Sequence, residues 1–206
     1  MHVDRARVGN LLGAVSLAVS DLTLTGAART AGVSSTAASA LVTLSVRPGL
    51  SVTDLGRRVG LSQPAAARMV EGLESAGLAE RRRGRRRGVA VHLTSAGLEV
   101  AGRVLGTREE SLGELVDALD PSQQGQLSEL LTVLLGGLYG RIGNAQYICR
   151  LCDRDSCQSD ATCPIGDAEE ADGGDTSTAN RGRLIAGLVR ESGVRRDRQP
   201  PSHSHE

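Results

Sequence analysis

The chain has no Phe and no Trp, and it has only two Tyr among its 206 residues. Its core must therefore be built from Leu, Val and Ala, a stock that suits helices better than aromatic-rich sheets. Lysine is absent too, so all 24 basic residues are Arg. We find no apolar stretch long enough to span a membrane, and no signal peptide with a basic start, an apolar run and a cleavage site. We therefore expect a cytoplasmic protein with no membrane partner.

The charges are unevenly distributed, although the formal net charge is zero. Between Arg47 and Thr94 ten Arg stand against four acidic residues, a local balance of +6. Between Asp153 and Asp175 eight acidic residues stand against Arg154 alone, a balance of −7. A basic centre beside an acidic tail is typical of a nucleic-acid-binding face followed by a solvating segment, although a merely patchy surface would look the same.

The spacing of the apolar residues predicts a mainly α fold with one small β-hairpin. Asp4, Ser34 or Ser35, Ser51, Ser62, and Thr94 or Ser95 stand where helix caps are expected. The expected helices cover 4–28, 34–45, 51–59, 62–77, 94–119 and 121–142, and the expected strands cover 78–82 and 89–93. In the helix over 121–142 we expect six leucines to face the interior: Leu127, Leu130, Leu131, Leu134, Leu135 and Leu138.

The C-terminal part is predicted to be less ordered. Residues 166–183 are acidic and rich in Gly, Ser, Thr and Asp, a composition typical of disorder. A short helix is expected at 184–191 and a loose tail at 195–206.

The centre of the chain has the pattern of a winged helix-turn-helix. A capped helix ends at Gly60, a second helix opens with Ser62-Gln63-Pro64, and an Arg-rich hairpin follows. Pro64 is tolerated in a first helical turn because the amides there have no partner within the helix. In such a unit the second helix enters the DNA major groove with its N-terminal residues toward the base edges.

The predicted DNA contacts come from this helix and from the hairpin, which is called the wing. Gln63 can make paired hydrogen bonds to adenine and Arg68 to guanine, or either can hold phosphate. The arginines around Gly84 form a cationic loop for the DNA backbone or a narrow minor groove. The full predicted set is Ser62, Gln63, Ala66, Ala67, Arg68, Arg81, Arg82, Arg83, Arg85, Arg86 and Arg87.

Three segments, residues 55–64, 70–78 and 91–97, resemble the MarR family of winged-helix regulators. The resemblance covers about residues 5–140 and implies an obligate homodimer, joined by its first and last helices, that binds a pseudo-palindromic operator. Family members usually repress, and many release double-stranded DNA when a small molecule or an oxidant acts as effector. The family's wing arginine falls on Arg86 or Arg87, but Arg85 stands where relatives often have Asp, which predicts a less selective, more salt-sensitive wing.

The resemblance suggests a division of the chain into five parts. We expect an N-terminal dimerisation helix (1–30), a DNA-binding domain (31–95), C-terminal dimerisation helices (96–145), a cysteine motif (146–165) and a disordered tail (166–206).

The cysteine motif lies outside the family pattern. Cys149, Cys152, Cys157 and Cys163 follow a C-x2-C-x4-C-x5-C spacing, which is similar to a zinc knuckle with Cys in place of His. Zn²⁺ is the first expectation. An iron–sulfur cluster is the alternative, because Cys163 precedes Pro164 as the last ligand does in some ferredoxins. A metal-free thiol switch, favoured by the nearby arginines, and four unligated cysteines remain open.

No arrangement of His, Cys, Ser or carboxylates predicts catalysis, so we expect no enzyme. The competing function is a protein-interaction module that uses the helical dimer and the cysteine motif without binding DNA.

Overall fold

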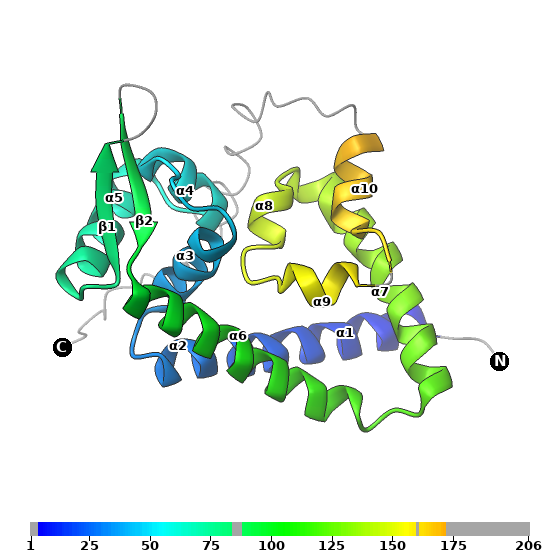
Figure 1. Ribbon diagram of the computed structural model, residues 1–206. Helices are drawn as coiled ribbons and strands as arrows, with labels where there is room; N and C mark the ends of the chain where they lie inside the picture. Colours follow the sequence, from blue (N-terminus) through cyan, green and yellow to red (C-terminus); the bar gives the residue numbers. More distant parts are fainter. Residues whose placement is uncertain (1–3, 84–87, 160, 172–206) are drawn as a thin grey trace, which may run out of the picture.

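The computed structural model describes residues 4–83, 88–159 and 161–171. Two strands and a series of helices make up this part of the chain (Figure 1). In chain order they are α1 (Arg5–Ser20), the π-helical turn η1 (Asp21–Gly26), α2 (Ala27–Thr30), α3 (Ser35–Val46), α4 (Val52–Val59), α5 (Gln63–Ser75), β1 (Ala79–Arg83), β2 (Val89–Leu93), α6 (Ser95–Val116), α7 (Pro121–Ile142), α8 (Ala145–Ile148), α9 (Arg154–Gln158) and α10 (Pro164–Ala171).

Most of the predicted helix starts are confirmed by their caps. The Ser34 side chain accepts a hydrogen bond from the Ala37 amide, and the Thr94 side chain accepts one from the Gly97 amide. Asp120 and Gln123 form a reciprocal capping box at the start of α7. Ser62 is the exception, because it takes the N-cap position of α5 with extended backbone but its side chain makes no capping hydrogen bond.

The main core lies in the centre of the chain, around α3. Leu41, Leu44, Leu55, Val70 and Val91 are completely or almost completely buried there and come from α3, α4, α5 and β2. The wing strands pair antiparallel from Ala79 with Leu93 to Arg83 with Val89. A single bridge adds Leu50 to Val91 on the other side of β2. An aliphatic core of this kind, closed by a small hairpin, fits a sequence without Phe or Trp.

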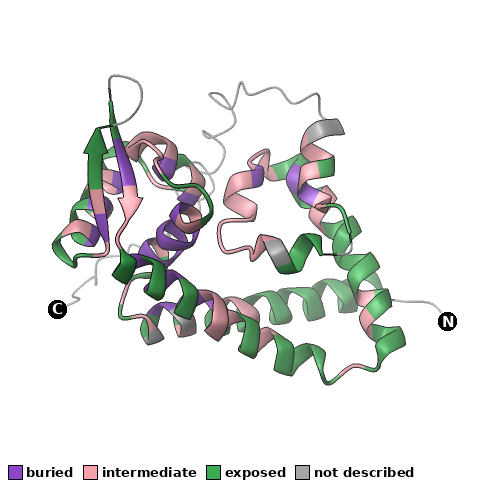
Figure 2. Cartoon of the chain, viewed as in Figure 1, coloured by how far each residue is buried: buried purple, intermediate pink, exposed green. Residues whose placement is uncertain are grey.

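Of the six leucines of α7 predicted to face the interior, Leu127 and Leu135 are half-buried, and Leu135 packs against the small core around Tyr139, but the other four are exposed. Leu130 is 62% exposed, and Leu131, Leu134 and Leu138 are exposed as well. The same holds for most apolar side chains of α1 and for Leu98, Leu115 and Val116 of α6. Figure 2 shows α1 and most of α7 in the colour of exposed residues, and exposed and intermediate residues alternating along the second half of α6. Helical spacing shows which side of a helix is apolar, but it does not show which chain covers that side.

The N-terminal helices also overturn the expectation that no stretch could span a membrane. Arg5–Gly26 contains a stretch of mean hydropathy 1.4 that is long enough to cross one by length and composition alone. Only 6% of that stretch is buried within the chain. A core helix of a soluble protein and a signal sequence near the N-terminus pass the same test, so the finding adds to the exposed apolar surface without naming what covers it.

The cysteine region is helical, and part of the predicted disorder is wrong. Residues 164–171 form α10, whose Ile165 is 2% exposed and packs with Tyr139 of α7 and Ala145 of α8. This small core orders the first residues of the segment that composition assigned to disorder. The predicted helix at 184–191 and the tail lie outside the described residues.

Candidate nucleic-acid interface and cysteine segment

The helix-turn-helix is formed by α4, Gly60 and α5. Gly60 has a φ of +76°, a left-handed conformation that favours glycine, and the Leu61 amide then donates to the Gly56 carbonyl at 2.8 Å. The two helices approach closely, since a Cβ added at Gly56 would lie 2.8 Å from the Cβ of Ala66. The turn therefore fixes α5 tightly across α4.

This packing decides which predicted residues of α5 can face DNA. Ser62, Gln63 and Arg68 are exposed, and Ala67 is half-buried. Ala66 is completely buried against Gly56, so its predicted contact with DNA does not fit the structure. The exposed side chains that remain are the polar ones.

The described part of the wing carries Arg81, Arg82 and Arg83, all exposed. Arg81 forms an ion pair with Glu74 of α5 at 2.6 Å, and its amide donates to the same carboxylate at 3.1 Å. Arg82 forms an ion pair with Glu80. The Arg81–Glu74 pair ties β1 to α5, while the predicted contacts Arg85, Arg86 and Arg87 lie outside the described residues.

The helix-turn-helix also contacts a segment that the sequence did not connect to it. Residues 144–152, with α8, lie against α4: the Asn144 side-chain amide donates to the Arg57 carbonyl at 3.3 Å, and the Arg58 guanidinium donates to the Gln146 side chain. A Cβ added at Gly60 would lie 2.5 Å from the Tyr147 ring, so the ring sits directly on the turn.

This cysteine segment, residues 144–171, has one further contact with the body of the chain and one within itself. Leu151 packs against the buried Val42 of α3 and Val104 of α6. The Arg150 guanidinium stacks 4.2 Å from the centre of the Tyr147 ring and donates to the Tyr147 carbonyl at 2.8 Å. One signal could have pointed here: of the two tyrosines of this aromatic-poor chain, Tyr147 lies in this segment and Tyr139 of α7 packs against it.

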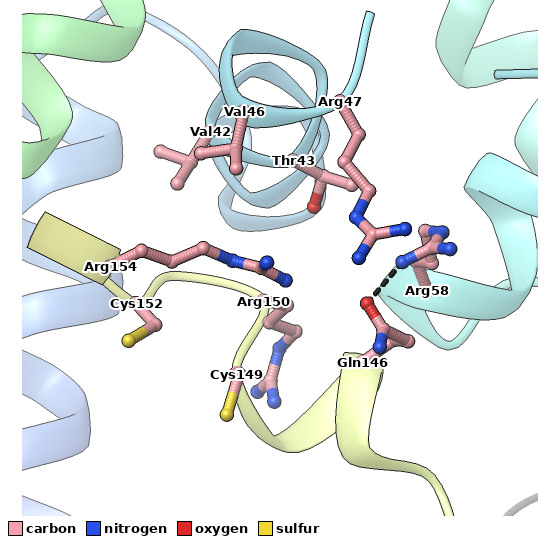
Figure 3. Close-up of a pocket in the computed structure, with 10 residues that line it drawn as sticks. All are labelled: Val42, Thr43, Val46, Arg47, Arg58, Gln146, Cys149, Arg150, Cys152 and Arg154. Atoms are coloured by element: carbon pink, nitrogen blue, oxygen red, sulfur yellow. Dashed lines mark hydrogen bonds between the residues drawn. The ribbon is translucent and has the colours of Figure 1, made fainter. Parts of the chain in front are cut away.

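Arginines gather where the segment meets α3 and α4. Figure 3 shows Arg47, Arg58 and Arg154 reaching into one pocket from three elements. Burial lowers the pKa of Arg58, and the neighbouring charge of Arg47 lowers it further. Several cations in a partly buried site create a strongly positive potential, which suits an anionic group.

Neighbouring thiols shift one another's pKa in this segment. Cys149 is paired with Cys152, which lowers the pKa of Cys149 and raises that of Cys152. Cys152 is in turn paired with Cys157, whose pKa is raised, chiefly by burial. The four cysteines line a common pocket. In the part of the chain that the structure describes, no three Cys, His, Asp or Glu side chains are already grouped as ligands of one ion, so the predicted metal site is not confirmed.

Comparison with known proteins finds a family match for the centre of the chain. Residues 31–88 match the sequence profile described as MarR family. MepR, a transcription regulator of the Staphylococcus aureus multidrug efflux pump MepA, is 19% identical, with a TM-score of 0.56 over 63% of this chain and 97% of its own. This chain has the winged-helix fold of the MarR family.

Two structures of the MarR family protein Rv2887 from Mycobacterium tuberculosis are similar as well. Its complex with DNA is 26% identical, with a TM-score of 0.51 over 61% of this chain and 95% of the other. Its complex with p-aminosalicylic acid is 25% identical, with a TM-score of 0.50 over 61% and 96%. No curated protein matches the chain. These MarR-family structures are almost fully covered, whereas more than a third of this chain has no counterpart in them.

Proposed function

We propose that this protein is a DNA-binding transcriptional regulator. The observation that carries the proposal is the exposure of Ser62, Gln63 and Arg68 on α5, directly after the Gly60 turn and beside a basic wing. The match of residues 31–88 to the MarR family and the similarity to a family member in complex with DNA support it.

The chemistry of the surface suggests how DNA is read. Gln63 can bond adenine and Arg68 can bond guanine through paired hydrogen bonds in the major groove. With only these two side chains of α5 suited to reading bases in this way, a large share of the affinity comes from the arginines of the wing and is lost as salt rises.

We further propose that the regulator is a homodimer. The exposed apolar side chains of α1, α6 and α7 form a surface that a monomer in water would not keep uncovered, and a second copy would cover it. A twofold dimer presents two reading helices, so the operator is a pseudo-palindrome with half-sites about one helical turn, ~34–36 Å, apart.

The finer parts of the proposal are repression, a cytoplasmic location and release by a small effector. We infer repression because a dimer bound at a promoter occupies it. We infer a cytoplasmic location because the protein must be in the same compartment as the DNA that it binds. The complex of the mycobacterial relative with p-aminosalicylic acid supports a small-molecule effector for this chain too. Adding p-aminosalicylic acid to the protein–DNA complex tests that part directly.

The test of DNA binding is the double variant Arg68→Ala/Arg86→Ala, measured by fluorescence anisotropy on the promoter fragment upstream of the protein's own gene. Loss of one base contact and one wing contact is expected to weaken binding by ~100-fold, since each is worth ~1–3 kcal/mol. The slope of log affinity against log salt is expected to fall by about one to two units, for up to two lost phosphate contacts.

The matched control removes two arginines elsewhere. Arg103 of α6 and Arg141 of α7 are exposed and lie outside the helix-turn-helix, so Arg103→Ala/Arg141→Ala changes the net charge equally and should bind almost as well as the wild type. Equal affinities of both double variants would reject DNA reading by α5 and favour the protein-interaction module.

A further inference from the structure

The cysteine segment brings four thiols from separate short elements to one place. Cys149 ends α8, Cys152 follows in the next turn, Cys157 lies in α9 and Cys163 directly precedes α10. All four line a single pocket of about 150 Å³. The chain between them thus folds back on itself.

The packing around two of the thiols supports a common site. Cys163 is brought to the same place by the small core of Tyr139, Ala145 and Ile165, against which Cys149 also packs. The Gly166 amide donates to the Cys163 sulfur at 3.4 Å, the kind of contact that stabilises a bound thiolate.

The surrounding charge fits an anionic centre. Arg47 and Arg154 line the same pocket as the four cysteines, and among its described lining residues the one acid is Glu169. Four thiolates around one divalent ion carry a net charge of −2. The two guanidinium groups would balance that charge, which gives them a role that they lack beside neutral thiols.

We propose that Cys149, Cys152, Cys157 and Cys163 together bind one Zn²⁺ ion. On binding, the four thiols release four protons to solvent and their sulfurs form four Zn–S bonds of about 2.3 Å in a tetrahedral site. The thiols must move closer together than they lie now. Because α8 and α9 have only four and five residues, this adjustment involves short elements. A closed site with four sulfur ligands leaves no position for water, so the ion stabilises structure and performs no hydrolysis.

An iron–sulfur cluster and a disulfide switch fit these observations less well. The spacing of four and five residues between the later cysteines is wider than in the bacterial ferredoxin motif. One disulfide would use only two of the four thiols, and two disulfides would carry no negative charge for Arg47 and Arg154 to balance. One ion per chain accounts for the complete set.

The position of the site suggests that the ion affects DNA binding. This part of the inference rests on the proposed function. The segment that carries the thiols lies on α4 through Asn144, Gln146 and Tyr147. Zinc would hold this segment rigid against the turn that places α5. Loss of zinc would therefore loosen the helix-turn-helix and weaken DNA binding without any change at Gln63 or Arg68.

The experiment begins with the full chain purified without oxygen and without added metal. Elemental analysis is expected to find about one zinc per chain in a colourless protein. Replacement by Co²⁺ is expected to give the intense visible bands of a tetrahedral thiolate site. Cys152→Ser and Cys163→Ser should each lower the zinc content at least ~10-fold, because a ligand is lost. The control Ser159→Ala, in the loop between Cys157 and Cys163, should keep the full zinc content.

Hydrogen exchange adds a readout that does not depend on the variants folding. Chelation of zinc from the wild type should speed amide exchange in residues 144–171 and in α4. A zinc-free protein, a brown protein with iron and sulfide, or zinc content unchanged by both serine variants would each overturn the proposal. Zinc content is measured without DNA, so failure of this proposal and failure of DNA binding are told apart.

Discussion

Replacing Leu131 by Glu is expected to convert the protein to a monomer and to lower its affinity for operator DNA by more than ~100-fold. Leu131 is 44% exposed in the single chain and lies in α7 among other exposed leucines. Covered by a second copy, the remaining exposed part of each Leu131 would contribute about 1 kcal/mol of burial, and the proposed dimer holds two of them. A buried carboxylate would add a desolvation penalty at both positions. A monomer binds only one half-site.

Sedimentation velocity measures the oligomeric state, and anisotropy measures the affinity. Gln126→Glu is the matched control, because it adds the same charge to an exposed polar position of α7 and should leave the dimer intact. A Leu131→Glu protein that stays dimeric would show that α7 is not the interface. Wild-type protein found in the membrane fraction, and released from it by apolar substitutions in Arg5–Gly26, would show that a bilayer covers the N-terminal helix instead.

The local structure of the DNA-binding unit was predictable because its signals act over a few residues. Ser51 accepts from the Asp54 amide and also donates to the Asp54 side chain, as a cap followed by an acid at the third helical position suggests. Gly60 has the positive φ expected of a turn between two helices, and Pro64 lies in the first turn of α5. Each of these features depends on backbone chemistry that a short stretch of sequence specifies completely.

Burial depends on partners that the sequence does not name. Ala66 is small and neutral in its preferences, so nothing in the sequence marked it as the residue that touches Gly56. The leucines of α7 were correctly predicted to share a helix, but the assumption that this chain buries all of them was wrong for Leu130, Leu131, Leu134 and Leu138. Both errors concern contacts between elements rather than the elements themselves.

The contact between the cysteine segment and α4 had no local signal at all. Gln146 and Arg58 are 88 residues apart, and neither belongs to a recognisable motif. The positive φ of the turn already explained a glycine at position 60. The sequence therefore offered no reason to expect that the Tyr147 ring also requires the absence of a Cβ there. A residue that satisfies one requirement can therefore hide another, and this contact links the DNA-binding unit to the cysteine segment.

Gly97 provides the second large effect, because it lies where α6 starts against the beginning of the wing. Gly97→Ala is expected to lower the free energy of unfolding by ~3 kcal/mol or more, at the upper end of overpacking effects. The new Cβ would lie 2.0 Å from the Leu78 carbonyl oxygen and 3.3 Å from the Leu93 Cβ. Neither can rotate away, since the Thr94 amide donates to that same carbonyl at 3.1 Å and the Thr94 hydroxyl donates to Gly77 at 2.7 Å. The substitution must therefore push the wing away from α6.

Thermal unfolding measures the effect, and Gly102→Ala provides the control on the same helix. A Cβ added at Gly102 meets no atom within 4 Å, so alanine there should raise the free energy of unfolding by about 0.5–1 kcal/mol through helix propensity. The two variants are expected to move the melting temperature in opposite directions, with Gly97→Ala lower by ~6–12 °C. A Gly97→Ala protein as stable as the wild type would mean that α6 does not approach Leu78 this closely. The wing would then be free to move relative to α6, and the affinity for DNA would no longer depend on the packing of α6 against the hairpin.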